Sequence, residues 1–284
     1  MVKLVDTKDL KSLPYGSASS SLAEGTKLKY MKIHFVFDKT NKAKLFKRNI
    51  KKFYKSYSLS KSECIVVAGG DGFMLQVLKK LYKQNKDFYG INCGSYGFLM
   101  NKKSFKNLEI KILKAKKNII NPLDIVVNTM DSKKKYIAIN DVSLFRQSRQ
   151  TASLKLKINN KTIIKKLIGD GVLISSPAGS TAYNLSVHGP ILSLNSGKIA
   201  ITPISPFRPR RWAGKVVSDK LSVYIKNLDA SKRPVAATAD NIEIRNVLSL
   251  SVKVNKKINI GLLHDSGESL VKKIKIEQIR RELY

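Results

Sequence analysis

Cysteine and histidine are scarce in this sequence of 284 residues, which has two cysteines and three histidines. Cys64 and Cys93 cannot cross-link a fold of this size, and no Cys/His cluster has the spacing of a zinc site. We therefore expect no resident metal site. A chain that does not rely on disulfides fits a reducing compartment, and we expect a cytoplasmic location.

Long apolar runs are also missing. No segment reaches the ~18 consecutive apolar residues of a membrane-spanning helix, so we expect no membrane partner. Glycine and proline are few, at 16 and 8 residues, against 43% hydrophobic residues, and this balance excludes collagen-like and wholly disordered chains. The length suits one large domain or two smaller ones.

Acidic residues are rare, at 20 against 54 Lys and Arg, which gives a net charge of +34. Most of the basic residues are lysines spread over nearly every segment, as on a solvated surface, so we expect no nucleic-acid partner. A basic nucleic-acid-binding protein is the alternative from a different functional class. The exception to the even spread is the loop Pro206–Trp212, where three arginines crowd together. This loop is a candidate contact for an anion or for a carboxylate of a second subunit, and a purely structural loop is the alternative.

The first 30 residues are rich in Ser and Lys and have no periodicity, so we expect an extra or disordered segment over 1–30. Met31 is a candidate for the true start. From there to residue 122, strand-like and helix-like patterns alternate, which predicts a parallel α/β domain. After the first strand, which follows Met31, the predicted elements are a helix over 44–57, a strand over 64–68, a helix over 73–82, a strand over 88–91 and a helix over 105–116.

The pattern changes after Pro122 to short β-like runs separated by turn residues, which predicts a β-rich domain over 123–262. The predicted strands are 123–127, 136–144, 154–158, 163–168, 172–174, 221–225 and 242–254. The remaining tail, 263–284, is predicted to be helical. The predicted fold class is therefore an α/β N-terminal domain followed by a β-rich C-terminal domain.

Three carboxylates stand beside glycine or asparagine at strand ends: Asp71, Asp141 and Asp170. Each could be a turn former or a helix cap. Glycines on both sides of Asp71 and Asp170, however, permit positive φ angles and close approach of a ligand. The Gly69–Gly72 turn lies between a strand and a helix, where free N–H groups and the helix dipole attract phosphate. Walker, dinucleotide-fold, protein-kinase and nucleophile-elbow motifs are absent.

Together, the GGDG turn at Gly69–Gly72, the pair Asn140–Asp141 and the run GDGVLISSPAGSTAYN over 169–184 resemble the ATP-NAD kinase family. GGDG alone marks the wider superfamily, which includes diacylglycerol and sphingosine kinases. PISPFRPRRW, KRPVAATAD and LLHD resemble the bacterial, particularly the alphaproteobacterial, branch. The resemblance runs from about Met31 to the C-terminus and implies a two-domain fold with the active site between the domains.

The resemblance implies phosphorylation of the 2′-hydroxyl of the adenosine ribose of NAD by ATP with a divalent cation, Mg²⁺, to give NADP. Asp71 would accept the proton, Gly69, Gly70 and Gly72 would meet the ATP phosphates, and Asp170 would contact the nicotinamide end. The other implied cofactor-binding residues are Asn140 and Asp141 on the diphosphate-ribose side, Thr181, Ala182, Tyr183 and Ser186 around the adenine, and Asn184 in the same block. Family members form dimers or tetramers, so we expect a homo-oligomer and regard the loop over 208–212 as a candidate subunit contact.

Two positions depart from the family pattern. The family usually has Asn-Glu where this chain has Asn140–Asp141, so we expect a weaker or water-mediated hydrogen bond to ribose. A basic residue often stands where this chain has Ile168. A lipid kinase of the same superfamily is the second enzymatic hypothesis, because the basic surface could meet anionic lipid. For Tyr183, a packing role in the core is the alternative to ligand contact.

Overall fold

The computed structural model describes residues 31–94 and 97–267. Contacts along the chain separate residues 1–30 as one unit from residues 31–284 as a second. Only the second unit is described below. The predictions for residues 1–30, and for the helical tail from residue 268 onward, lie outside the described residues.

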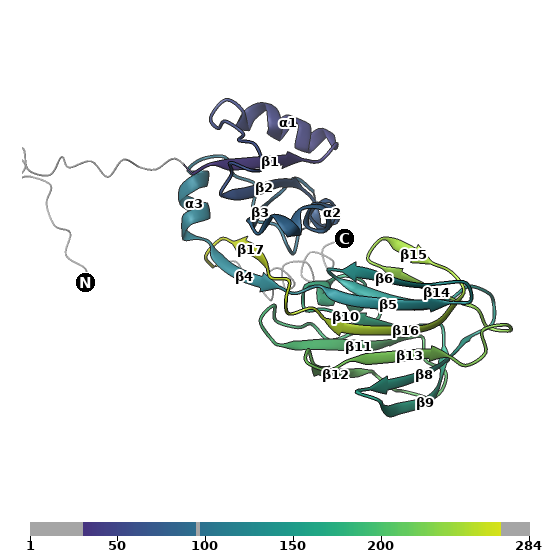
Figure 1. The fold of residues 1–284 in the computed structure, drawn as a ribbon. Helices are drawn as coiled ribbons and strands as arrows, with labels where there is room; N and C mark the ends of the chain where they lie inside the picture. The colour runs from purple at the N-terminus through teal and green to yellow at the C-terminus, as the bar shows by residue number, and fades with distance from the viewer. Residues whose placement is uncertain (1–30, 95–96, 268–284) are drawn as a thin grey trace, which may run out of the picture. The chain divides into compact units, whose positions relative to one another are not determined.

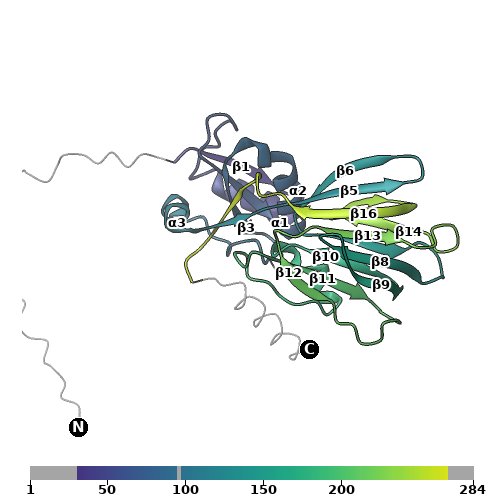
Figure 2. The same cartoon turned by 60° about the horizontal axis from the view of Figure 1, so that its bottom comes forward.

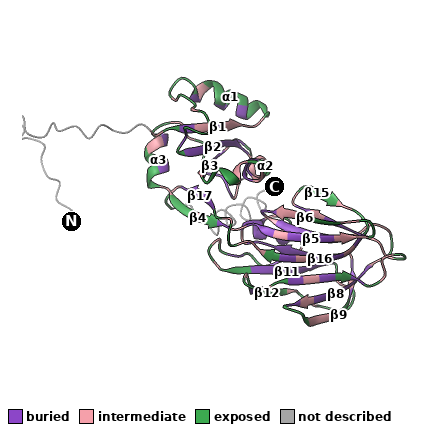
Figure 3. Cartoon of the chain, viewed as in Figure 1, coloured by how far each residue is buried: buried purple, intermediate pink, exposed green. Residues whose placement is uncertain are grey.

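A five-stranded sheet forms the first part of the described chain, in the order β1 (Ile33–Phe37), β2 (Cys64–Gly69), β3 (Asp87–Asn92), β17 (Ile260–His264) and β4 (Lys116–Ile120) (Figure 1). The first four strands are parallel, and β4 is antiparallel to β17. Strands β2 and β17 are buried along their whole length (Figure 3). Burial on both faces explains why β2 is a continuous apolar run in the sequence.

Helices cover both faces of this sheet. Side chains of α1 (Asn41–Ile50) and α3 (Leu108–Lys114) share one apolar cluster with the sheet, and those of α2 (Asp71–Leu81) share another. A short 3₁₀ turn, Tyr82–Gln84, follows α2. The α1 helix ends at Ile50, seven residues before the predicted end. The chain beyond it bonds to β1 instead, since Tyr57 N–H donates to the Ile33 carbonyl (2.9 Å) and Ser56 Oγ accepts from Phe35 N–H (3.2 Å).

Two six-stranded antiparallel sheets form the second part (Figure 2). One has the order β6 (Lys133–Ala138), β5 (Leu123–Thr129), β16 (Val247–Val254), β13 (Val223–Asn227), β8 (Ala152–Ile158) and β9 (Lys161–Gly169). The other has the order β12 (Lys215–Ser218), β11 (Lys198–Ile204), β10 (Gly171–Ser175), β7 (Asp141–Arg146), β14 (Val235–Ala239) and β15 (Ile242–Ile244). Residues of both sheets fill one apolar core, as in a β-sandwich. A 3₁₀ turn, Ala178–Thr181, and the short helix α4 (Tyr183–Ser186) follow β10.

The predicted strand over 136–144 is two strands in the structure. The chain leaves the β5–β6 pair at Ala138 and enters the other sheet at Asp141. Between them, the backbone N–H groups bond to a side chain, the Asp240 carboxylate, and not to a neighbouring strand. The predicted strand over 242–254 is likewise interrupted, at Asn246, whose φ of 56° is not compatible with a strand.

The structure has the predicted order, an α/β part followed by a β-rich part. The exception is the last strand, β17, which returns to the sheet of the first part. Residues 260–262, which the sequence pattern assigns to the second domain, lie in β17 of the first sheet, and so do Leu263 and His264, for which the prediction of a helical tail is wrong. The chain passes between the two parts after β4 and again before β17. Those two passages are joined by the Asn255 N–H, which donates to the Pro122 carbonyl (2.8 Å).

None of the helices within residues 31–94 and 97–267 has the length and apolarity needed to span a membrane. The same part of the chain contains no group of three or more His, Cys, Asp or Glu side chains arranged to hold a metal ion.

Candidate active site

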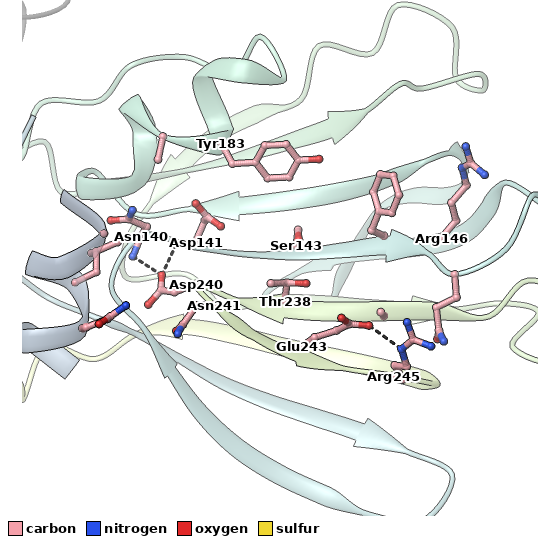
Figure 4. Close-up of a pocket in the computed structure, with 17 residues that line it drawn as sticks. Asn140, Asp141, Ser143, Arg146, Tyr183, Thr238, Asp240, Asn241, Glu243 and Arg245 are labelled. Atoms are coloured by element: carbon pink, nitrogen blue, oxygen red, sulfur yellow. Dashed lines mark hydrogen bonds and ion pairs between the residues drawn. The ribbon is translucent and has the colours of Figure 1, made fainter. Parts of the chain in front are cut away.

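A cavity of about 740 Å³ lies between helix α2 and the β7–β14–β15 face of the second part (Figure 4). Gly72, Leu75 and Gln76 of α2 form one wall. The opposite wall includes Asn140 and Asp141. Five of the predicted site residues line this cavity: Gly72, Asn140, Asp141, Ala182 and Tyr183.

Asp71 is the first residue of helix α2, beside the cavity-lining Gly72. Its two carboxylate oxygens accept hydrogen bonds from the backbone of the following loop, Oδ2 from Phe98 N–H (2.7 Å) and Oδ1 from Leu99 N–H (3.1 Å). The side chain does not cap its own helix, because Gly70 occupies the N-cap position. An ionised carboxylate has about four acceptor sites on its two oxygens, so it can accept more than these two hydrogen bonds.

The glycines around Asp71 and Asp170 differ in what their missing side chains allow. None of them has a positive φ, so the left-handed backbone that glycine permits is not used there. A methyl group added at Gly171 would collide with the Leu144 carbonyl oxygen, so this glycine permits close packing of strands β10 and β7. At Gly70 and Gly72, by contrast, an added methyl group would have no atom within 4 Å, which leaves open space beside Asp71.

The loop that carries Asn140 and Asp141 is held by the carboxylate of Asp240. Asp240 follows strand β14 with a φ of 52° and accepts three backbone hydrogen bonds, from Ile139 (2.8 Å), Asn140 (2.9 Å) and Asp141 (3.3 Å). Its own N–H donates to the Asp141 carbonyl (3.1 Å). This residue therefore fixes the loop where β6 ends and β7 begins.

The other side of the same loop packs against the turn after β10. Ser176 Oγ donates to the Ile139 carbonyl (2.6 Å), and Ser176 N–H donates to the Asn140 carbonyl (2.8 Å). Gly179 lies so close to the Asn140 backbone that a β-carbon there would collide with it. Held in this way, Asn140 keeps its side-chain oxygen buried without a hydrogen-bond partner among the described residues. An unsatisfied acceptor beside a cavity is suited to a ligand donor.

Asp141 is 8% exposed, and burial, together with the negative charge of Asp240, raises the pKa of its carboxyl from 3.8 to about 7. At neutral pH a large fraction of this group is therefore protonated. A protonated carboxyl can donate a hydrogen bond, whereas an ionised carboxylate only accepts.

This raised pKa predicts a fall in stability with rising pH. Between about pH 4 and pH 7 the folded protein retains a proton on Asp141 that the unfolded chain has released, so the free energy of unfolding decreases by at most about 4 kcal/mol. The variant Asp141→Asn should lose this part of the slope. Urea unfolding at several pH values measures it, with Asp131→Asn, at an exposed turn, as the control. Equal slopes in wild type and Asp141→Asn would contradict the assignment.

Asp170 does not line the cavity, but it pairs with a residue that does. Arg146 Nε donates to Asp170 Oδ1 (2.6 Å), and Arg146 lies at the end of the cavity away from Asn140 (Figure 4). The basic group beside Asp170 is therefore the guanidinium of Arg146, which comes from strand β7. The position two residues before Asp170, where the family often has a basic residue, is Ile168 in this chain. The backbone of Ile168 is engaged elsewhere, in bonds with Arg208.

Tyr183 is 40% exposed and lies on the cavity wall formed by α4 (Figure 4). Partial burial, then the negative charges of Asp141 and Asp170, raise the pKa of its hydroxyl. With a large exposed fraction facing the cavity, the ring has no core position of the kind that the alternative interpretation requires.

The remaining predicted site residues lie outside the cavity lining. Asn184 is fully buried and its amide is used within the fold, since Nδ2 donates to the Pro190 carbonyl (2.9 Å) and Oδ1 accepts from Thr202 Oγ1 (2.7 Å). Thr181 is buried and Ser186 is exposed. Gly69 and Gly70 precede α2 at the end of β2.

Several cavity residues have no counterpart in the sequence predictions: Ser143, Arg146, Gln147, Thr238, Asp240, Asn241, Glu243 and Arg245. The most connected of them, Asp240, stands after an apolar strand as Asp71 does. It is followed by Asn241, so the feature that selected the other three carboxylates, a neighbouring glycine or asparagine at a strand end, is also present at Asp240. Arginine is rare in this chain, and the two arginines in the set are signals that composition could have provided.

The arginine-rich loop lies apart from the cavity lining. Phe207 is 51% exposed, with the guanidinium groups of Arg208 and Arg210 at 5.4 and 5.7 Å from its ring centre. Arg208 is anchored to strand β9, because its carbonyl accepts from Ile168 N–H (2.7 Å).

Comparisons with known proteins agree on one family. The model of the ATP-NAD kinase C-terminal domain matches residues 139–259. NAD kinase of Zymomonas mobilis is 40% identical over 89% of this chain and 99% of that protein, and NAD kinase of Brucella suis is 41% identical over 87% and 97%. Among solved structures, yeast NADH kinase complexed with NADH has a TM-score of 0.72 at 19% identity, covering 86% of each chain. This last likeness concerns the fold.

Proposed function

This chain belongs to the NAD kinase family and phosphorylates NAD with ATP, and on that premise we propose that the cavity beside α2 binds NAD with Asp71 as the base. The observation that carries the proposal is one cavity, of about 740 Å³, lined both by the GGDG helix and by the Asn140–Asp141 loop. The two motifs are far apart in the sequence, and the fold brings them to the same space.

Asp71 would accept the proton of the 2′-hydroxyl of the adenosine ribose. A general base must come within hydrogen-bond distance of the proton that it removes. Asp71 immediately precedes Gly72, which lines the cavity, and the open space at Gly70 and Gly72 admits a phosphate group close to the backbone. The start of helix α2 adds free N–H groups and a positive dipole for the transferred phosphoryl group.

NAD recognition would use the opposite wall. The unpaired side-chain oxygen of Asn140 can accept from a ribose hydroxyl, and a protonated Asp141 can donate. Asp141 is one methylene shorter than the usual Glu, but it stands on a loop fixed by Asp240. The proton that it retains near neutral pH would reduce repulsion of the NAD diphosphate. Mg²⁺ enters with ATP as part of the substrate and neutralises charge on the phosphates.

The decisive assay is NADP formation by purified protein given ATP, Mg²⁺ and NAD, with a diacylglycerol acceptor in parallel. NADP without phosphorylated lipid supports the proposal. Phosphorylated lipid without NADP would mean that the GGDG turn reports the superfamily alone and that the ligand assignments from Asn140 onward are wrong.

Tyr183 gives a single-residue test of the adenine position. Stacking on an aromatic ring contributes about 1–3 kcal/mol per base, so Tyr183→Ala should raise the NAD KM by roughly five- to a hundredfold. Tyr183→Phe keeps the ring and should stay near the wild-type value. Steady-state kinetics at fixed ATP measures both variants, and an unchanged KM in Tyr183→Ala would exclude this residue from adenine recognition.

Quaternary structure is part of the proposal. We propose a homodimer or homotetramer in which the loop over 208–212 contacts a neighbouring subunit. The exposed Phe207 ring with two guanidinium groups near it supports this, since Arg and aromatic side chains are enriched at protein interfaces. The cytoplasmic location stays a prediction from the sequence.

A further inference from the structure

One stripe of helix α2 faces the second part of the protein. Gly72, Leu75 and Gln76 line the cavity, and Lys79 continues the series at the next helical position. The spacing of three, four and seven residues from Gly72 places all four residues on the same face of the helix. The start of this helix carries Asp71, so any shift of the stripe also shifts the proposed base.

Lys79 joins the helix to the end of strand β14. Its Nζ lies 3.4 Å from Asp240 Oδ2 and donates to Asn241 Oδ1 at 3.2 Å. The pair is shielded from solvent, with 18% of the Lys79 side chain and 4% of the Asp240 side chain exposed. An ion pair at this depth is screened far less by solvent than a surface pair.

Asp240 is the same residue that fixes the loop of Asn140 and Asp141. Through its carboxylate, one ammonium group on α2 is connected to three consecutive backbone N–H groups of that loop. The connection therefore runs from the helix that carries the proposed base to the residues proposed to hold the ribose.

We propose that Lys79 is a positioning residue for NAD phosphorylation, which sets helix α2 and its Asp71 against the Asp240-bound loop that presents Asn140 and Asp141. This inference rests on the proposed function. Lys79 touches no reacting atom in it. Its contribution is geometric, because it holds the two walls of the cavity in register, and electrostatic, because its charge offsets that of Asp240.

The electrostatic part has a measurable sign. Charged or titratable groups from several elements lie in or beside the cavity that Asp141 lines: Asp240 after β14, Tyr183 of α4, the Arg146–Asp170 pair, the Glu243–Arg245 pair, and Asp71 and Lys79 of α2. Loss of the Lys79 cation leaves the negative charge of Asp240 unopposed by it. Ionisation of Asp141 then becomes harder, so its pKa rises further above about 7.

The test compares Lys79→Met, which keeps side-chain length without charge, with Lys79→Arg, which keeps the charge. Lys80→Met, at the exposed neighbouring position on the same helix, is the matched control. We expect Lys79→Met to lower kcat/KM for NAD by roughly ten- to a hundredfold, the scale of a small misplacement of reacting groups. Its pH profile should move to higher pH, Lys79→Arg should recover most of both effects, and Lys80→Met should match wild type.

Two further measurements keep the outcome decisive. If Lys79→Met does not fold, Lys79→Gln retains a hydrogen-bonding group without the charge and should show the same displacement of the pH profile. If these uncharged variants have the kcat/KM for NAD and the pH profile of the wild-type protein, the proposal is wrong. If the wild-type protein itself makes no NADP, the proposed function fails. The pH dependence of unfolding of the Lys79 variants then still reports the electrostatic connection to Asp141, and an unmoved dependence would overturn that connection.

Discussion

Asp71→Asn should lower the turnover of NAD phosphorylation by about 10²–10⁴-fold, the usual contribution of a general base. The amide is nearly the same size and keeps one acceptor oxygen for the Phe98 and Leu99 amides, so the fold should persist. What the substitution removes is the oxygen lone pair that takes a proton. NADP formation under saturating NAD and ATP measures the effect.

The control for Asp71→Asn is Glu109→Gln, which removes an acidic side chain from the first turn of another helix, α3. It should leave turnover unchanged, since α3 lies outside the cavity lining. Thermal unfolding of both variants separates loss of catalysis from loss of structure. Near-wild-type turnover by folded Asp71→Asn would remove the residue from the role of base.

Asp240→Ala should have the largest effect on stability, a loss of about 3–5 kcal/mol, because it leaves three backbone N–H groups without their acceptor and Lys79 without its ion-pair partner. Domains have only about 5–15 kcal/mol in total, so the variant should be partly unfolded at moderate temperature. NAD binding should fall with it, since the Asn140–Asp141 loop loses its anchor. Urea unfolding and calorimetric titration with NAD measure the two effects.

Asp240→Asn provides an intermediate variant, as asparagine tolerates the positive φ at this position and keeps one acceptor oxygen. Asp131→Ala, which removes an exposed acidic side chain, is the matched control. Surface substitutions of this kind change the free energy of unfolding by about 0.5 kcal/mol or less. A stability of Asp240→Ala within 1 kcal/mol of wild type would contradict the anchoring role.

Local patterns predicted the elements whose burial is set by near neighbours. Strand β2 was readable because both its faces are covered, which produces an uninterrupted apolar run. The start of α2 was readable because the GGDG turn follows that run directly. The break at Ile139–Asn140 was not readable, because the group that replaces the strand partner is Asp240, about a hundred residues later in the chain.

The residues of the candidate site likewise include some that motifs predict and others that depend on contacts between distant segments. Asn140, Asp141 and Tyr183 could be carried over from motifs, and all three line the cavity. Asn184 belongs to the same motif as Tyr183, but its side chain forms hydrogen bonds with Thr202 and Pro190 inside the fold. The motif does not reveal which of its side chains point into the cavity and which point into the fold. The proposed role of Lys79 depends on its contact with Asp240, which follows a strand far along the chain. In a chain with so many lysines, the sequence alone does not single out this one.

The return of β17 to the first sheet has a consequence for biosynthesis. Ile260–His264 fill the position between β3 and β4, so the sheet has a gap until these late residues have been made. During synthesis β1, β2 and β3 can pair with one another, but β3 and β4 each keep an unpaired edge until β17 is available. Such edges favour association with other chains. The first sheet can therefore be completed only after the whole second part has been made, and until then shielding of these two edges protects the nascent chain.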